Sequence, residues 1–319
     1  MKRRWLALVV GVMAGIACLF AGHQRYVAEG PLAQSRNVVL PHGTPAELAV
    51  VLRNAEVIES IREFEIAALL TRGAGSLHAA ELTFPAHASL RQVLMILRTG
   101  RPVQHRLTIP EGLTAAQIAL LIDRADALSG DAAVPEEGSV LPQTYAYDYG
   151  MTRSAFIEHA QAAMQKTVER IWGERSAGLP LASPADLVTL ASIVERETAR
   201  PEERPHVAAV YLNRLRNGMK LQADPTVAYA ASGGMGSLDH PITRAELDSS
   251  NPYNTYRFAG LPPGPIASPG LASLQAVARP IASDDLYFVA DGTGGHLFAR
   301  TLDEHNRNVR DRKPKTGTL

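Results

Sequence analysis

Two glutamates separated by a single residue, Glu195 and Glu197, have the type and spacing expected of acid–base chemistry. They close a predicted helix that starts at Ser183-Pro184, an N-cap followed by a proline at the first helical position. At about 100° per residue, they lie about 80° to either side of Leu187 on the apolar stripe, while Arg196 points away. Desolvation beside a buried face raises a carboxyl pKa toward that of a general acid. The alternative is that both glutamates are solvated residues on the helix flank.

Further polar side chains follow at two proline-marked turns. Gln222, Asp224 and Thr226 surround Pro225, and the segment 253–256 follows a second proline. Aromatic rings can pack against a ligand, and amides and hydroxyls can hydrogen-bond its polar groups. We therefore expect substrate contacts from Tyr253, Asn254, Thr255 and Tyr256. The alternative is a loop role, in which Asp224-Pro225 caps a helix and Asn251-Pro252 makes a turn.

The chain from Thr152 onward reads mainly as helix and must position these residues. Apolar periodicity and start signals predict helices over 154–172, 184–198 and 205–217. Ser268 and Pro269 are expected to cap and open another helix that stops before Pro280.

The end of the chain carries strand signals and one more helix signal. Residues 286–290 and 296–299 flank a glycine-rich turn and predict a β-hairpin. Thr301 and Glu304 form a capping box that opens a final helix.

Three similar segments precede the helical part. Each reads as a short strand, a proline-marked turn and an amphipathic helix, over residues 39–52, 83–97 and 107–122. They fit a generic packing domain or, more specifically, a small glycan-binding module resembling a LysM fold. The fold class expected is α+β: an N-terminal transmembrane helix, a small LysM-like α/β module, and a mainly helical catalytic domain with a C-terminal β-hairpin.

An apolar N-terminal segment follows a basic tip. Trp5 to Gly22 carries no charge, and Lys2, Arg3 and Arg4 precede it. Eighteen helical residues span roughly 27 Å, enough to cross the hydrocarbon core of a bilayer. A cleaved signal peptide is the alternative, but the run is long and no A-x-A pattern ends it. We expect an uncleaved anchor with residues 5–22 in the membrane, the tip in the cytoplasm and the rest outside.

Composition excludes several classes of protein. The 319 residues carry 32 basic and 32 acidic side chains, which argues against a dedicated nucleic-acid binder. The single cysteine, Cys18, cannot form an intramolecular disulfide or a thiolate metal cluster. His296 and His305 lack the spacing of an HExxH motif, so we expect no metal site. Without the basic tip, 29 basic and 32 acidic residues remain, and the exported part is mildly acidic.

Several long motifs follow one another in the second half of the chain. They are LASIVERET at 190–198, VYLNRL at 210–215, GMKLQADPTV at 218–227, PYNTY at 252–256, GLPPGPIASPG at 260–270, YFVAD at 287–291 and HN at 305–306. In this order they resemble the MltG (YceG-like) family of endolytic murein transglycosylases, and the resemblance extends over nearly the whole exported chain. Gln143 stands where that family often has aspartate, so no role is assigned to it.

The resemblance implies a lyase reaction on peptidoglycan. The β-1,4 bond between N-acetylmuramic acid and N-acetylglucosamine is cleaved inside glycan strands, leaving a 1,6-anhydromuramyl end. One carboxyl suffices without a cofactor, because it protonates the leaving oxygen and then accepts the proton of the sugar's own 6-hydroxyl. Hydrolysing glycosidases instead use two carboxylates.

The resemblance also maps roles onto residues. The catalytic acid maps onto Glu195. Substrate binding is expected from Glu197, Asn213, Gln222, Asp224, Thr226, Tyr253, Asn254, Thr255 and Tyr256.

The expected organisation is an anchor at 1–25, a LysM-like module at 36–107 and a transglycosylase domain at 108–312. The chain is expected to cross the bacterial inner membrane once, with a cytoplasmic N-terminus and a periplasmic catalytic domain. The expected partners are peptidoglycan strands and the peptidoglycan synthases whose nascent strands it would terminate.

Two other functions are considered. The family has also carried the label aminodeoxychorismate lyase, a pyridoxal-phosphate activity that needs a Schiff-base lysine. Outside the tip and tail only Lys166 and Lys220 are available, and an exported enzyme lacks ready access to that cofactor. The stronger alternative is a non-catalytic scaffold that binds peptidoglycan within the wall-synthesis machinery.

Overall fold

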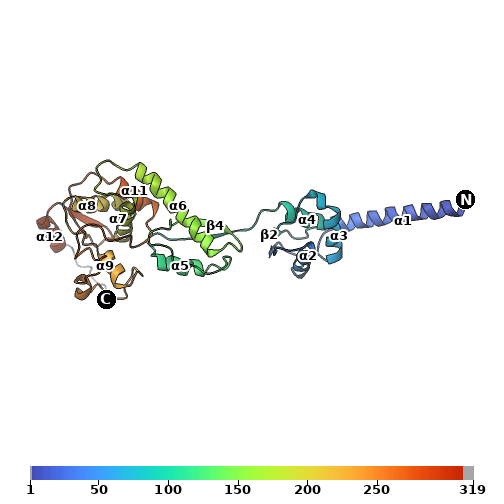
Figure 1. Cartoon of the computed structure of the whole chain (residues 1–319), viewed down its shortest axis with the longest axis horizontal. Helices are drawn as coiled ribbons and strands as arrows, with labels where there is room; N and C mark the ends of the chain where they lie inside the picture. Colours follow the sequence, from blue (N-terminus) through green and yellow to red (C-terminus); the bar gives the residue numbers. More distant parts are fainter. Residues whose placement is uncertain (1, 312–319) are drawn as a thin grey trace. The chain divides into compact units, whose positions relative to one another are not determined.

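The computed structural model describes residues 2–311, which divide into two compact units. Unit 1 holds the chain up to His105 together with Tyr147–Gly150. Unit 2 holds Arg106–Ala146 and the chain from Met151 onward. Both are mixtures of helix and strand with small sheets, and helix predominates, as expected (Figure 1).

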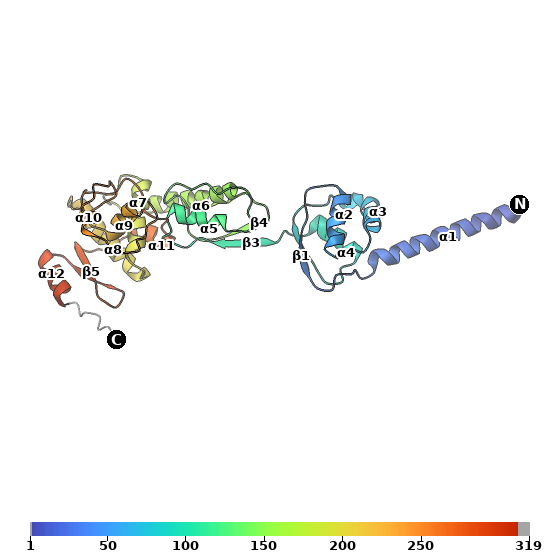
Figure 2. The ribbon, with the colours of Figure 1, turned by 90° about the horizontal axis from the view of Figure 1, so that it is seen from below.

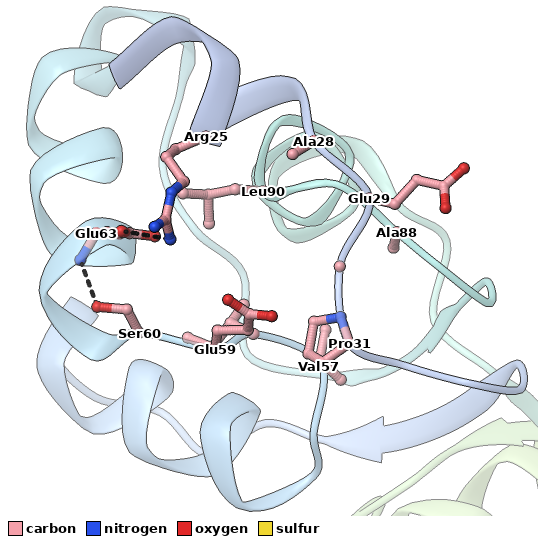
Figure 3. A pocket seen from close by; sticks show the side chains of 12 residues that line it. Arg25, Ala28, Glu29, Pro31, Val57, Glu59, Ser60, Glu63, Ala88 and Leu90 are labelled. Atoms are coloured by element: carbon pink, nitrogen blue, oxygen red, sulfur yellow. Dashed lines mark hydrogen bonds and ion pairs between the residues drawn. The ribbon is translucent and has the colours of Figure 1, made fainter. Parts of the chain in front are cut away.

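Unit 1 begins with the long helix α1 (Lys2–Val27). Within it, Leu8–Val27 is long and apolar enough to cross a membrane, with a mean hydropathy of 1.4 and no part of the segment buried. The end of α1 contacts helix α4 (Leu90–Thr99), and Arg25 forms an ion pair of 3.4 Å with Glu63 of helix α3 (Ile61–Leu70) (Figure 3).

The rest of unit 1 is a small module built around one two-stranded sheet. Its elements are β1 (Arg36–Val39), α2 (Pro45–Asn54), α3 (Ile61–Leu70), η1 (Arg72–Ala74), β2 (Glu81–Phe84) and α4 (Leu90–Thr99). Strands β1 and β2 pair antiparallel, with Arg36 opposite Phe84. Capping boxes start α2 at Thr44 and α4 at Ser89, so both expected strand–turn–helix segments are present. Helix α3, which has no counterpart among the predicted elements, adds Phe64 to the core.

A two-stranded ribbon of β3 (Gln104–Thr108) and β4 (Thr144–Asp148) follows the module in the sequence. Helix α5 (Ala115–Asp123) completes the third expected strand–turn–helix segment, with a capping box at Thr114.

Unit 2 is mainly helical, and several of its helices pack against the helix α7 (Pro184–Glu197) (Figure 2). Its remaining elements are α6 (Arg153–Gly173), α7 (Pro184–Glu197), η2 (Pro201–Glu203), α8 (Arg204–Arg216), α9 (Asp224–Ala231), α10 (Arg244–Leu247), α11 (Leu271–Ala278), β5 (Tyr287–Ala290), β6 (His296–Ala299) and α12 (Leu302–Asp311). Helices α6, α8, α9 and α11 all contact α7. Strands β5 and β6 pair antiparallel, with Tyr287 opposite Ala299.

The predicted spans of α6, α7 and α8 are confirmed to within about one residue at each end. Burial on α7 is broader than the single stripe expected, because every residue from Leu187 to Val194 is buried. A helix buried on all sides carries no polar face, so the periodicity alone understates how central α7 is.

The predicted start of α11 is wrong. Its N-cap is Gly270 rather than Ser268. Ser268 instead pairs through its backbone with the loop before α5, since Gly112 N donates to Ser268 O at 3.0 Å and Ser268 N donates to Leu113 O at 2.8 Å. This extended pairing fixes Ser268 outside the helix and delays its start by two residues.

Candidate functional site

The last residues of α7 direct three charged side chains to three different sets of partners. Consecutive helical residues are about 100° apart, so Glu195, Arg196 and Glu197 leave the helix in different directions. The helix ends at Thr198, whose backbone turns to an extended conformation.

Glu195 is held in a buried ion pair. Its Oε1 accepts a hydrogen bond from Arg204 Nη2 at 2.7 Å, and its Oε2 accepts one from the Gly270 backbone N–H at 2.9 Å. Arg204, itself buried, also contacts Glu111 at 3.3 Å. Both oxygens of Glu195 are therefore occupied, and the pair joins the ends of α7 and α8 to the start of α11.

Arg196 does not simply point into solvent as expected. Its guanidinium donates to Gly112 O at 3.2 Å and to Gly236 O at 2.7 Å. The residue is exposed overall, but its head group ties two loops to α7.

Glu197 lines a pocket of about 350 Å³ in unit 2. Its Oε2 atom is buried and has no hydrogen-bond partner among residues 2–311, while the Tyr211 side chain hydrogen-bonds the carboxyl. Burial and, after it, the nearby charge of Asp224 raise the pKa of Glu197 to about 7, against the opposing effects of Tyr211 and Arg214. Glu197 is therefore a carboxyl that can hold a proton near neutral pH.

Arg214 forms one wall of this pocket and holds its parts together. Its Nε donates to Leu286 O at 2.6 Å, and its Nη1 donates to Leu221 O at 2.7 Å and to Gln222 Oε1 at 3.3 Å. Burial lowers the pKa of Arg214, but a guanidinium remains charged. The side chain joins α8 to the loop before α9 and to the start of β5.

Gln222 and Asp224 line the same pocket from the start of α9. Gln222 has a φ of 53°, which is uncommon for a residue other than glycine, and its N–H donates to Thr255 O at 3.2 Å. Asp224 Oδ1 accepts a 2.5 Å hydrogen bond from the Tyr256 hydroxyl. Burial and Asp224 raise the pKa of Tyr256, so this phenol stays a donor.

His296 on β6 lines the pocket as well. Its Nδ1 lies 2.7 Å from Glu203 Oε2, and its backbone N–H donates to Glu203 Oε1 at 3.2 Å. Since Glu203 accepts from Nδ1–H, the neutral ring presents Nε2 as an acceptor. The ring packs edge-on against Phe288.

Four of the residues predicted to form the site are brought together at this pocket. They are Glu197, Gln222, Asp224 and Tyr256.

The remaining predicted residues make internal contacts elsewhere. Asn213 donates to Ser283 O and Asp285 O, and Asn254 donates to three carbonyls of the segment 246–249. The hydroxyls of Thr226 and Thr255 lie 2.9 Å apart in the interior. Tyr253 packs on Tyr229, whose hydroxyl donates to Glu137.

Three polar residues that line the pocket were not among the predicted site residues: Tyr211, Arg214 and His296. Tyr211 and Arg214 are three residues apart, and this spacing places them on one face of α8. Polar side chains on an otherwise buried face are the signal that would have identified them. The sequence around His296 carries no comparable signal, because this side chain is oriented by Glu203, which is distant in the sequence.

Within residues 2–311, no group of three or more histidine, cysteine, aspartate and glutamate side chains is arranged to hold a metal ion.

Comparison with known proteins identifies relatives that match most of the chain. A model of the YceG-like family matches residues 38–311. A protein named endolytic murein transglycosylase from Bacillus subtilis strain 168 is 29% identical over 305 residues, which cover 85% of this chain and 83% of that protein. A protein of the same name from Streptococcus pneumoniae strain D39 is 29% identical over 363 aligned positions, covering 95% of this chain but only 64% of that protein. The crystal structure of a YceG-like protein from Listeria monocytogenes matches with a TM-score of 0.53 and 27% identity, over 86% of this chain and 99% of the other.

Proposed function

Because the chain belongs to the YceG-like family, we propose that it is a lytic transglycosylase that cleaves peptidoglycan glycan strands internally. The bond cleaved is the β-1,4 bond between N-acetylmuramic acid and N-acetylglucosamine, and the product is a 1,6-anhydromuramyl end. The observation that carries this proposal is the pocket with Glu197, a carboxyl whose pKa is about 7.

We assign the general acid to Glu197, in place of Glu195. Both oxygens of Glu195 are occupied by Arg204 and the Gly270 N–H, and Glu195 is not among the residues that line the pocket. Glu197 lines the pocket, and its Oε2 has no partner among the described residues. A group that must give up a proton to the substrate needs a protonated carboxyl with an oxygen that no other protein group occupies, and this description fits Glu197.

The proton then moves in a closed cycle. Protonated Glu197 donates its proton to the glycosidic oxygen as the bond to the muramyl C1 breaks. The resulting carboxylate accepts the proton of the muramyl 6-hydroxyl, whose oxygen forms the new bond to C1. No water is consumed, and Glu197 ends protonated. Asp224 supports the cycle because its negative charge favours the protonated form of Glu197.

Polar groups around Glu197 would hold the sugar. Gln222, Tyr256 and His296 line the pocket with amide, phenol and imidazole groups that can bond to sugar hydroxyls and acetamido groups. The positive charge that develops at C1 would be eased by the acetamido group of the substrate or by these polar groups.

The chain around the catalytic unit suggests where it acts. Helix α1 supports a single-pass anchor in the bacterial inner membrane, with the basic tip in the cytoplasm and the rest of unit 1 and unit 2 in the periplasm. The small antiparallel sheet and helices of unit 1 support a glycan-binding, LysM-like module. An enzyme anchored in this way would meet strands as synthases release them, and its cuts would terminate nascent strands.

The test of this function is the chemistry of the product. Full-length protein in detergent is incubated with purified glycan strands in water enriched in heavy oxygen, and the products are analysed by mass spectrometry. We expect new ends that are one water lighter than hydrolysis products and carry no heavy oxygen. Reducing ends that carry the isotope would show a hydrolase, and the absence of any cleavage would favour the scaffold function.

A further inference from the structure

Helix α3 of unit 1 has an exposed apolar face. Ile66, Leu69 and Leu70 are 58%, 62% and 79% exposed, and their i, i+3, i+4 spacing places them on one side of the helix. The opposite side carries Phe64, Ala67 and Ala68 into the core of the module. Three large apolar side chains on one helical turn form a surface of the kind that marks an interaction site.

This face is continuous with the apolar helix α1. A hollow of about 510 Å³ is lined by Cys18, Leu19 and Gly22 of α1 together with Ile66 and Leu70 of α3. Its surface is mostly apolar, and it lies within unit 1. The α3 face therefore lies beside the second half of the segment Leu8–Val27, the candidate membrane span.

The end of α1 is fixed against the module by polar and apolar contacts. Arg25 pairs with the carboxylate of Glu63, and Figure 3 shows the two side chains in direct contact at one side of a small hollow. The Ser60 hydroxyl accepts from the backbone N–H of Glu63 at the N-terminus of α3. Tyr26 packs against the core of the module. The depth of α1 in a membrane therefore determines the depth of α3.

We propose that the α3 face, Ile66, Leu69 and Leu70, inserts among the lipid acyl chains of the outer leaflet of the membrane that α1 spans. This inference rests on the proposed anchoring by α1. If α1 spans the bilayer, Cys18 and Leu19 lie within the hydrocarbon layer, and the side chains that share their hollow lie at the same depth. Exposed Arg62 and Arg72 flank the face in the sequence and suit the phosphates of the lipid head groups.

Site-directed spin labelling of the full chain tests this proposal. Single cysteines replace Leu70, Leu69, Met13 or Val50 in a Cys18→Ser background, and the labelled proteins are reconstituted into vesicles of phosphatidylethanolamine and phosphatidylglycerol. Met13 lies in α1, and Val50 is an exposed apolar residue of α2 in the same module. Oxygen concentrates in lipid and a nickel chelate concentrates in water, so their relative effects on each label report its depth.

We expect labels at Leu70 and Leu69 to resemble the label at Met13, with an oxygen-to-nickel ratio several-fold higher than at Val50. If the label at Met13 is in lipid but the labels at Leu70 and Leu69 match the label at Val50, the α3 face does not insert into lipid. The proposed anchoring by α1 is then still supported. Labels at Leu70 that neither reagent reaches would show a protein partner or a second copy on the face, and would also overturn the proposal. A label at Met13 in water would overturn the anchor and this inference together, and would leave the catalytic assignment untouched.

Discussion

Replacing Glu197 with glutamine is expected to lower the rate of glycan-strand cleavage by about 10²- to 10⁴-fold, the usual contribution of a general acid. Glutamine keeps the shape of the side chain but has no acidic proton to give to the glycosidic oxygen. The rate is measured on purified strands with the full-length protein in detergent, by chromatography of the released fragments. Circular dichroism of the variant should match that of the wild type, because glutamine has the same size and keeps an oxygen that can accept from Tyr211.

The matched control is Glu195→Gln, a change of the same size two residues earlier on the same helix. Glutamine at this position keeps one oxygen that can accept from Arg204 or from the Gly270 N–H but loses the second acceptor. We therefore expect a less stable protein that still folds and retains most of the wild-type rate. The assignment would be reversed if Glu195→Gln were folded but inactive while Glu197→Gln cleaved strands normally.

Replacing Arg204 with methionine is expected to destabilise the protein by about 3–5 kcal/mol, because the carboxylate of Glu195 is then buried without its partner. The Glu195 side chain is only 4% exposed, and Arg204 also contacts Glu111, which is more exposed. Denaturant unfolding of the full chain in detergent, followed by circular dichroism, measures the loss.

A second substitution shows whether the loss of stability comes from the unpaired charge of Glu195 or from a packing defect at position 204. In the double variant Arg204→Met with Glu195→Leu, the unpaired charge is gone, and we expect most of the lost stability to return. The control is the exposed pair of Arg244 and Asp248, whose side chains are 85% and 51% exposed at a distance of 2.9 Å. Arg244→Met should cost under about 1 kcal/mol. A double variant no more stable than Arg204→Met alone would contradict the ion-pair explanation.

The main elements could be predicted from the sequence because their signals are local. The start signal at Ser183 and the capping box at Thr301 predict helices that the structure contains. The start of α11 could not be predicted, because backbone pairing with Gly112 and Leu113, more than 150 residues earlier, overrides the cap signal at Ser268.

The order of the two glutamates could not be decided from periodicity. Both lie at the same angle from the apolar stripe, and only residues distant in the sequence separate their environments. Glu195 meets Gly270, 75 residues away, whereas Glu197 meets Asp224 across the pocket. These contacts depend on how α8, α9 and α11 pack on α7, which a single helix does not determine.

Polar residues near prolines were only partly informative for the same reason. Asp224 and Tyr256 reach the pocket, but Asn254 and Thr226, which lie two residues from them, turn inward to backbone and hydroxyl partners. Sugar-binding side chains and loop-stabilising side chains have the same composition, so residue type alone could not separate the two groups.

The central claim, that Glu197 is a protonated acid near neutral pH, is tested most directly by titration of its carboxyl. Full-length protein with carbon-labelled glutamate side chains is followed by NMR from acid to mildly alkaline pH, and the Glu197→Gln spectrum identifies the resonance. Since burial and Asp224 favour the protonated form, we predict a transition with a pKa of about 7. A transition near 4.5, the ordinary pKa of a glutamate side chain, would contradict the account.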